Sequence, residues 1–131
     1  MKGPRCFTTG LNRLALAFSG LASASSPAAE PDANLAADAK EIFRSHCAEC
    51  HTGDQARSGV EILAHDVLID NGYLVEEEPD DSVIYQLMTS TGQDVMPPSN
   101  RPALTADEIA TIRKWIVAGA AAFPKDVQLK K

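Results

Sequence analysis

Two cysteines and a histidine lie within five consecutive residues, Cys47-Ala-Glu-Cys50-His51, and form the pattern C-x-x-C-H. This pattern is the signature of c-type haem attachment. Cysteines three positions apart lie on one side of a helical turn, so their thiols can add to the two vinyl groups of one haem. His51 is then held under the iron and can supply an axial imidazole. The pattern therefore predicts a covalent, iron-containing haem c attached through Cys47 and Cys50, with His51 as its proximal ligand.

Three other uses of the same residues stay open at this point. Cys47, Cys50, His51 and His65 could together bind a structural zinc ion. The two cysteines could form a thiol–disulfide redox pair, although such pairs normally lie in a βαβ context that this sequence lacks. They could also form a plain disulfide, but its loop is too short to stabilise the fold much. Haem is favoured because it is attached outside the cytoplasm, and the motif follows a predicted export signal.

Haem iron in an electron carrier usually has a second axial ligand, and a methionine thioether raises the reduction potential relative to a second histidine. We predict Met96 for this position. It lies in the loop Thr91 to Leu104, which contains three prolines and a glycine and cannot form a regular helix. Pro97 and Pro98 stiffen the loop, so less entropy is lost in holding the sulfur at the iron.

The other methionine and two histidines are rivals for the distal position. Met88 has helical spacing with apolar neighbours, which is typical of a core residue. His46 precedes Cys47 and is expected on the same side of the iron as His51. His65 has no stiffening context and is expected at the surface or beside a haem propionate.

Helical patterns predict the elements that position these residues. A helix is expected over Ala36 to Cys47, capped by Asp32 or Asn34, with one apolar face. That face comprises Ala39, Ile42, Phe43, His46, Cys47 and Cys50. The stretch Val60 to Leu74 is predicted to be irregular with one helical turn, and it contains the turn signal Asn71-Gly72.

The second half of the chain has clearer boundaries. The acidic stretch Glu76 to Asp81 is expected to be a solvated loop that ends in a helix cap at Asp81 or Ser82. A helix from Val83 to about Ser90 follows. Thr105-Ala-Asp-Glu108 forms a capping box that opens a helix from Ala106 to Ala118, and Gly119 follows as the C′ residue. No alternating strand pattern occurs in the sequence, so the predicted fold class is all-α.

The first 24 residues are typical of a secretory signal peptide. Lys2, Arg5 and Arg13 precede or flank the apolar run Leu14 to Ala22, and Ala22-Ser-Ala24 fits a cleavage site. We therefore expect an exported, periplasmic protein. The apolar run is too short for a transmembrane segment. Residues 25–35 are expected to be a linker, residues 36–124 one compact domain and residues 125–131 a polar tail.

Composition excludes several classes of function. The chain has 131 residues with a formal net charge of −6, which argues against binding nucleic acid. Aromatic residues make up only 5% of the chain, which disfavours a β-sandwich, whereas 44% hydrophobic residues suffice for a core. The acidic balance predicts redox partner proteins with a basic docking patch and an association rate that falls as salt rises.

These residues together resemble a known family. Phe43 on the first helix, the C-x-x-C-H motif, the Met96 loop and Trp115 on the last helix are similar to class I cytochrome c. Four segments are similar in detail to the planctomycete-type cytochrome c domain: Ser82 to Tyr85, Met96 to Pro98, Leu104 to Ile109 and Trp115 to Ala120. The resemblance covers about Ala36 to Pro124. It implies three to four short helices around one covalently attached haem, with Phe43 against Trp115 or Ile112.

The chain departs from the family's pattern after the motif. Many class I cytochromes have a proline there, whose carbonyl orients the ligating histidine. No proline occurs here between His51 and Pro79. Another carbonyl must therefore accept the Nδ1 proton of His51, and the sequence does not name it. The family's frequent Trp-Pro ending is Phe123-Pro124 in this chain.

The sequence thus predicts a monohaem c-type cytochrome that carries one electron, with His51 and Met96 as axial ligands, and not an enzyme. Two alternatives stay open. One is a haem-containing electron-relay module of a larger oxidoreductase complex. The other is a haem sensor or peroxidase-like protein with an open sixth site. Tyr73, Tyr85 and Asn100 could hydrogen-bond to the haem, although packing or surface roles are the more common use of such residues.

Overall fold

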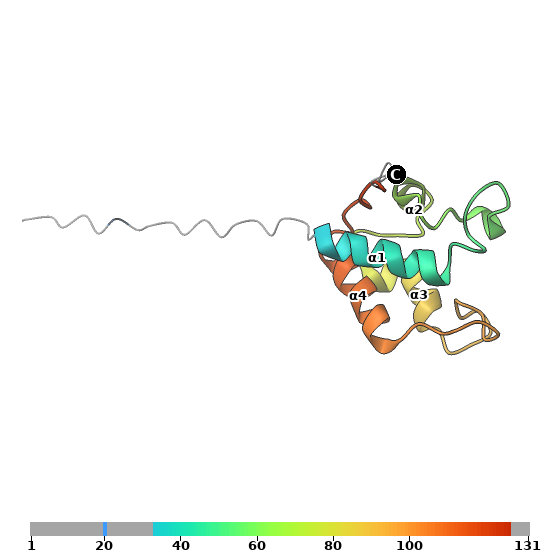
Figure 1. The fold of residues 1–131 in the computed structure, drawn as a ribbon. Coiled ribbons are helices and arrows are strands. Elements are labelled where there is room, and N and C mark those ends of the chain that lie inside the picture. The colour runs from blue at the N-terminus through green and yellow to red at the C-terminus, as the bar shows by residue number, and fades with distance from the viewer. Residues whose placement is uncertain (1–19, 21–32, 127–131) are drawn as a thin grey trace, which may run out of the picture.

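A computed structural model describes residue 20 and residues 33–126 of the chain, and Figure 1 shows their arrangement. The described part contains four α-helices, two short 3₁₀ helices and no strand, which confirms the all-α class. The elements are α1 (Ala33–His46), η1 (Arg57–Gly59), α2 (His65–Asp70), η2 (Pro79–Asp81), α3 (Val83–Thr89) and α4 (Ala106–Val117).

Helices α1 and α4 pack against each other and form the core of the fold (Figure 1). Ala36 and Ala39 are small and fully buried on α1, so the two helix backbones can approach closely. Phe43 and Trp115 meet edge to face, with ring centroids 5.8 Å apart and planes at 73°. The contact implied by the family resemblance between these two aromatic residues is therefore present.

Two further rings complete an aromatic cluster, which we define as Phe43, His65, Trp115 and Phe123. Phe123 stacks on Trp115 with centroids 5.2 Å apart, and His65 meets both rings edge to face. His65 Nε2 donates a hydrogen bond to the carbonyl of Ala120 at 2.6 Å. The expectation that His65 lies at the surface or beside a propionate was wrong, because its side chain is only 14% exposed and lies within this cluster.

The segment before α3 is fastened by one buried hydroxyl. Ser82 is fully buried, and its Oγ accepts the N–H of Val75 at 2.9 Å while it lies within hydrogen-bond distance of the Val75 and Glu78 carbonyls. It makes no side-chain cap hydrogen bond to α3. The sequence thus places the start of α3 correctly, but Ser82 binds the acidic loop instead of capping the helix.

Helix α4 begins as the sequence predicts. Thr105 Oγ1 accepts the backbone N–H of Glu108, and the Glu108 carboxylate accepts the backbone N–H of Thr105 in return. The helix ends at Val117, with Ala118 as its C-cap residue. Gly119 follows with a φ of +97°, a left-handed conformation that favours glycine and ends the helix.

Helix α1 begins at Ala33 and not at Ala36, so Asn34 lies inside the helix instead of capping it. Asp32 and the predicted signal peptide lie outside the described residues, apart from Gly20. At the other end of the chain, Lys40 Nζ donates to the Pro124 carbonyl and to Asp126, which holds residues 124–126 along α1. Within the described residues, every helix is too short or too polar to cross a membrane.

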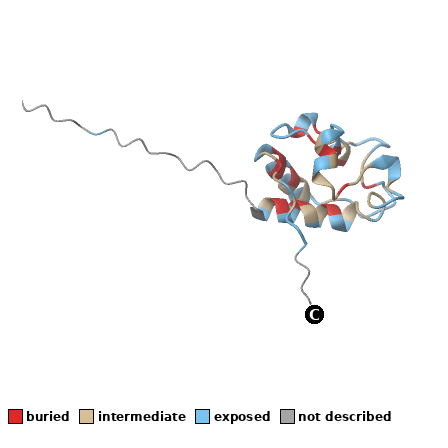
Figure 2. Ribbon diagram, turned by 90° about the horizontal axis from the view of Figure 1, so that it is seen from above, coloured by how far each residue is buried: buried red, intermediate tan, exposed pale blue. Residues whose placement is uncertain are grey.

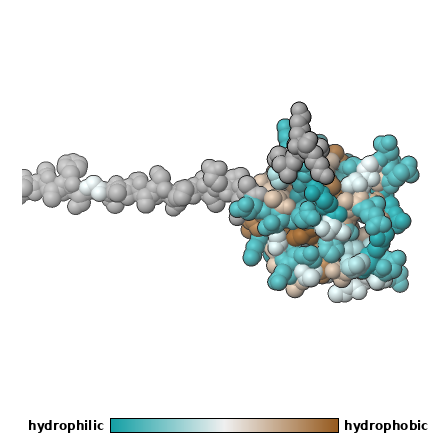
Figure 3. Space-filling model, viewed as in Figure 1, coloured by the Kyte–Doolittle hydropathy of each residue, from teal (hydrophilic) through white to brown (hydrophobic). Residues whose placement is uncertain are grey.

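Burial is uneven across the molecule. Buried segments gather where α1 packs on its neighbouring helices, whereas the loops beyond the C-terminal end of α1 are largely exposed (Figure 2). The face in Figure 3 is hydrophilic over most of its area, with a small hydrophobic area near its centre. Cys47, His51 and Met96 all belong to the less buried end, and each is half-buried.

Candidate haem site

The C-x-x-C-H segment continues the path of α1 as a helical turn. The N–H of Cys47 bonds the Phe43 carbonyl at 2.9 Å, and the N–H of His51 bonds the Cys47 carbonyl at 3.0 Å. Neither Cys47 nor Cys50 is in a disulfide. Burial, and to a smaller extent the neighbouring Cys50, raise the pKa of the Cys47 thiol to about 11. The turn therefore presents two free thiols and one imidazole from within five residues at the end of α1.

His51 is oriented by a backbone carbonyl that the sequence did not identify. Its Nδ1 lies 3.1 Å from the carbonyl oxygen of Arg57. Because a carbonyl can only accept, this hydrogen bond places the ring proton on Nδ1. The lone pair of Nε2 is then free for a metal, which is the usual arrangement of a ligating histidine.

The loop around η1 holds this carbonyl in place. The N–H of Arg57 bonds the Cys50 carbonyl at 2.9 Å, and the N–H of Ile62 bonds the His51 carbonyl at 2.8 Å. Ser58 and Gly59 both have left-handed backbones, with φ of +57° and +68°. The backbone carbonyl of Arg57 thus accepts the hydrogen bond from His51 that a proline carbonyl accepts in many class I cytochromes. The Ser58-Gly59 pair signals a turn, but no residue type signals where a carbonyl points.

Met96 is held in place by one backbone hydrogen bond and by the burial of the residue that follows it. Its N–H donates to the Leu87 carbonyl at 3.0 Å, which ties the loop to α3. Pro97 is buried, whereas Pro98 is exposed. Met96 is therefore the point at which an otherwise exposed loop turns toward the interior.

An apolar cavity of about 200 Å³ lies between the C-x-x-C-H turn, the η1 loop and α3. Its lining residues are Cys47, His51, Ser58, Val60, Ile62, Tyr73, Val83, Ile84, Leu87, Met88 and Met96. Most of these side chains are aliphatic or aromatic. A space of this kind, with a few polar groups, is typical of a cofactor site.

A second, more polar cavity of about 320 Å³ adjoins the first. Its lining residues are Ser45, His46, Cys47, Glu49, Cys50, His51, Arg57, Ser58, Met96, Pro97, Pro98, Asn100, Arg101 and Pro102. Cys47, His51, Ser58 and Met96 line both cavities. The four residues predicted from the sequence as the haem site are therefore brought together, with Cys50 on the polar side.

The rival residues are placed differently. His65 lines neither cavity, and His46 Nε2 lies 3.0 Å from a Glu108 oxygen beside the polar cavity. Met88 is buried and lines only the apolar cavity, not the polar one. Among the described residues, no group of three or more His, Cys, Asp or Glu could hold a metal ion, which argues against the zinc alternative.

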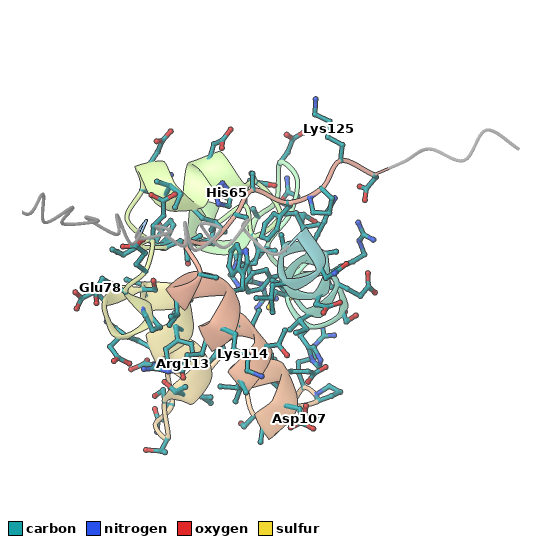
Figure 4. All side chains as sticks on the ribbon, turned by 90° about the vertical axis from the view of Figure 1, so that its left-hand side faces the viewer. His65, Glu78, Asp107, Arg113, Lys114 and Lys125 are labelled. Atoms are coloured by element: carbon teal, nitrogen blue, oxygen red, sulfur yellow. The ribbon has the colours of Figure 1, made fainter. Side chains whose placement is uncertain are left out.

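Of the three polar residues considered for haem contacts, two lie at the cavities. Tyr73 lines the apolar cavity and Asn100 the polar one. Tyr85 lines neither, and the guanidinium carbon of Arg113 lies 5.6 Å from its ring centroid. Arg113 itself points outward from α4 in Figure 4. Tyr85 of α3 is therefore partly buried against the core and in contact with Arg113 of α4, away from both cavities.

The residues present fit a haem. The site supplies two thiols at one edge, an imidazole whose Nε2 is free, a thioether and an apolar wall. A structural zinc site would need four ligands. An all-protein oxygen site for a hard cation would need several carboxylates or carbonyls. Although several side chains of these types line the polar cavity, no three or more His, Cys, Asp or Glu among the described residues are grouped so that they could hold a metal ion.

One comparison with known proteins, that with family models, agrees with this chemistry. Comparison with curated proteins and with solved structures found no match to this chain. Residues 47–100 match a family model, and this segment runs from the first cysteine of the motif past Met96 to Asn100. The matched family is described as Planctomycete cytochrome C, so the resemblance inferred from the motifs is confirmed over these residues and indicates haem-based electron transfer.

Proposed function

We propose that this protein is a monohaem c-type cytochrome that carries one electron between redox partners. In this proposal Cys47 and Cys50 attach the haem, His51 is the proximal ligand and Met96 is the distal ligand. The observation that carries the proposal is the hydrogen bond from His51 Nδ1 to the Arg57 carbonyl, at a cavity that Cys47 and Met96 also line. This hydrogen bond leaves the lone pair of His51 Nε2 free, as it must be in a histidine that binds a metal.

Each residue has a distinct physical role in this proposal. The bound haem would supply the one-electron couple of its iron. The two cysteines fix the position of the group at one edge, and Arg57 fixes the orientation and tautomer of His51. The apolar wall formed by Val60, Ile62 and Leu87 limits water at the site, which lowers the local dielectric constant and affects the potential.

The proposal extends to location and partners. The signal-like N-terminus supports export to the periplasm, and the net charge of −6 supports partners with a basic docking patch. On the described surface, side chains of both signs cover α4, where Asp107, Arg113 and Lys114 point outward in Figure 4. The role that we propose is that of an electron carrier and not of an enzyme, because the matched family indicates electron transfer.

The test of this proposal is the absorption spectrum of the exported protein and of Met96→Ala, with Met88→Leu as the matched control. The purified protein is expected to contain one covalent haem by the pyridine haemochrome assay and to be low-spin. Met96→Ala is expected to abolish any methionine-to-iron charge-transfer band, whereas Met88→Leu keeps it. Absence of covalent haem would defeat the proposal. A high-spin ferric spectrum of the unaltered protein would instead support the sensor or peroxidase-like alternative.

A further inference from the structure

A bidentate ion pair joins the C-x-x-C-H turn to the loop that carries Met96. Arg101 Nη1 donates to Glu49 Oε2 at 2.6 Å, and Nη2 donates to Oε1 at 2.9 Å. Glu49 is one of the two residues between the cysteines of the motif, and Arg101 is 52 positions further along the chain. Both side chains line the polar cavity, so the pair spans the space between the two predicted haem-binding segments.

The Met96 loop has few other attachments. Within the described residues, three hydrogen bonds connect residues 91–104 with segments beyond their immediate neighbours. One is the bond from the Met96 N–H to Leu87, and the other two belong to the pair of Arg101 with Glu49. Arg101 is also fixed to the turn of its own loop, because its N–H donates to the Pro98 carbonyl at 2.8 Å. A displacement of Arg101 would therefore displace Pro98 and, through the chain, the adjacent Pro97 and Met96.

We propose that Glu49 and Arg101 are positioning residues for Met96, which hold the distal loop over the site by fastening it to the C-x-x-C turn. The inference rests on the proposed function, in which Met96 is the distal ligand. Parallel N–H···O bonds fix direction as well as distance, so the pair holds the loop in one orientation. Without it, the loop between α3 and α4 would depend on a single backbone hydrogen bond and on the burial of Pro97.

The electrostatics of the pair agree with this role. The hydrogen bonds from Arg101, and then its charge, hold the pKa of the Glu49 carboxyl below its ordinary value. The same contacts raise the pKa of Arg101. Both groups therefore stay charged at neutral pH. Because both side chains are exposed, the interaction is open to screening by salt, and its effect on Met96 should weaken as ionic strength rises.

The experiment measures how fast added imidazole replaces Met96 in the ferric holoprotein, followed by the absorption spectrum. Arg101→Gln keeps a polar side chain that can donate hydrogen bonds, but it shortens the side chain and removes the charge. The matched control is Arg113→Gln, because Arg113 of α4 is about equally exposed and pairs with Asp80 of η2, and neither residue lines a cavity. We expect imidazole binding to be about threefold faster in Arg101→Gln than in the unaltered protein, and unchanged in Arg113→Gln.

Two further measurements make the result specific to the pair. In a cycle with Glu49→Gln, the effect of Arg101→Gln should disappear when Glu49 has already been replaced. Raising the salt concentration should speed imidazole binding in the unaltered protein and leave Arg101→Gln unaffected. The inference is overturned if Arg101→Gln behaves like Arg113→Gln, or if its effect is the same with and without the Glu49 carboxylate.

Failure of this inference can be told apart from failure of the proposed function. If Met96→Ala does not alter the spectrum, then Met96 is not the distal ligand and both ideas are wrong. If Met96→Ala removes the methionine band but Arg101→Gln does not speed imidazole binding, then the ligand assignment stands and the positioning role is rejected.

Discussion

The aromatic cluster and the haem-site end of the molecule are built in opposite ways. In the cluster, Phe43, Trp115 and Phe123 pack ring against ring, and Ala36 and Ala39 of α1 are fully buried in the same core. At the other end, two adjoining cavities lie between the segments, and backbone hydrogen bonds and one ion pair set the positions of the loops.

The contrast separates a region that is ordered by its own side chains from the region that we propose to hold the haem. Side-chain packing orders the first region, because each ring has its partners within the protein. In the second region, the His51 ring bonds to a backbone carbonyl and the Met96 N–H donates to another, and both side chains line the two cavities. We therefore expect substitutions in the first region to change stability, and substitutions in the second to change the properties of the haem.

The largest expected effect is that of Trp115→Ala. Trp115 is 1% exposed, touches three rings and donates its Nε1–H to the Ala121 carbonyl at 3.0 Å. Its truncation should lower the free energy of unfolding by about 3–5 kcal/mol, measured by urea denaturation of the holoprotein. Trp115→Phe, which keeps most of the packing and loses the hydrogen bond, should cost about half as much or less. A loss below about 1 kcal/mol in Trp115→Ala would contradict our placement of the core.

Ser82→Ala should have an intermediate effect, in a region ordered by hydrogen bonds. The substitution leaves the buried N–H of Val75 without its acceptor, so the free energy of unfolding should fall by about 1–3 kcal/mol. Ser45→Ala is the control, because Ser45 is exposed and its single contact with Glu41 is long, at 3.4 Å. Equal stabilities of the two variants in urea would show that the Ser82 hydroxyl does not fasten the acidic loop.

Gly59→Val should change the reduction potential of the haem more than the stability of the fold. Gly59 has a left-handed φ of +68°, and a Cβ there would meet no atom within 4 Å, so the substitution acts through backbone strain. The strain should shift the Arg57 carbonyl away from His51. Loss of that hydrogen bond makes the imidazole a weaker donor, which favours the reduced iron. A redox titration should show a potential higher by about 20–60 mV, equivalent to a hydrogen bond of about 0.5–1.5 kcal/mol.

The matched control for Gly59→Val is Gly119→Val. Gly119 also has a left-handed φ, of +97°, and also has no atom within 4 Å of a built Cβ, but it lies at the end of α4 and lines neither cavity. It should lose stability with an unchanged potential. If both variants shift the potential equally, then general strain and not the Arg57 carbonyl is the cause.

The same contrast explains what could be predicted from the sequence. The capping box at Thr105 and Glu108 and the start of α3 were predictable because they depend on residues a few positions apart. The Phe43–Trp115 contact followed from the family resemblance. The ligand candidates could be named because thiols, imidazoles and thioethers are rare and chemically distinctive side chains.

The missed features depend on groups without a sequence signature or on partners far along the chain. The Arg57 carbonyl belongs to the backbone, and every residue has one. His65 meets a carbonyl 55 positions away, so its burial depends on where the C-terminal segment returns. The pairing of Glu49 with Arg101 depends on the path of a proline-rich loop, which propensity does not determine.

The smallest expected effect is that of Glu108→Gln, which tests a link between the two regions. The backbone N–H of Thr105, with His46 adding a smaller contribution, holds the pKa of Glu108 below its ordinary value. A carboxyl with a lowered pKa in the folded state stabilises the protein above its ordinary pKa and loses this effect as pH falls through the folded value. At neutral pH, Glu108→Gln should cost about 0.5 kcal/mol, because Gln keeps the capping geometry and loses the charge.

The measurement is the difference in unfolding free energy between the unaltered protein and Glu108→Gln, from neutral pH down to about pH 3. The difference should shrink as the Glu108 carboxylate is protonated, and the haem spectrum should stay the same throughout, because Glu108 does not line either cavity. A constant difference across this range would mean that the hydrogen bonds and not the charge of Glu108 account for its effect. A spectral change would mean that His46, which touches both Glu108 and the polar cavity, transmits the state of α4 to the haem site.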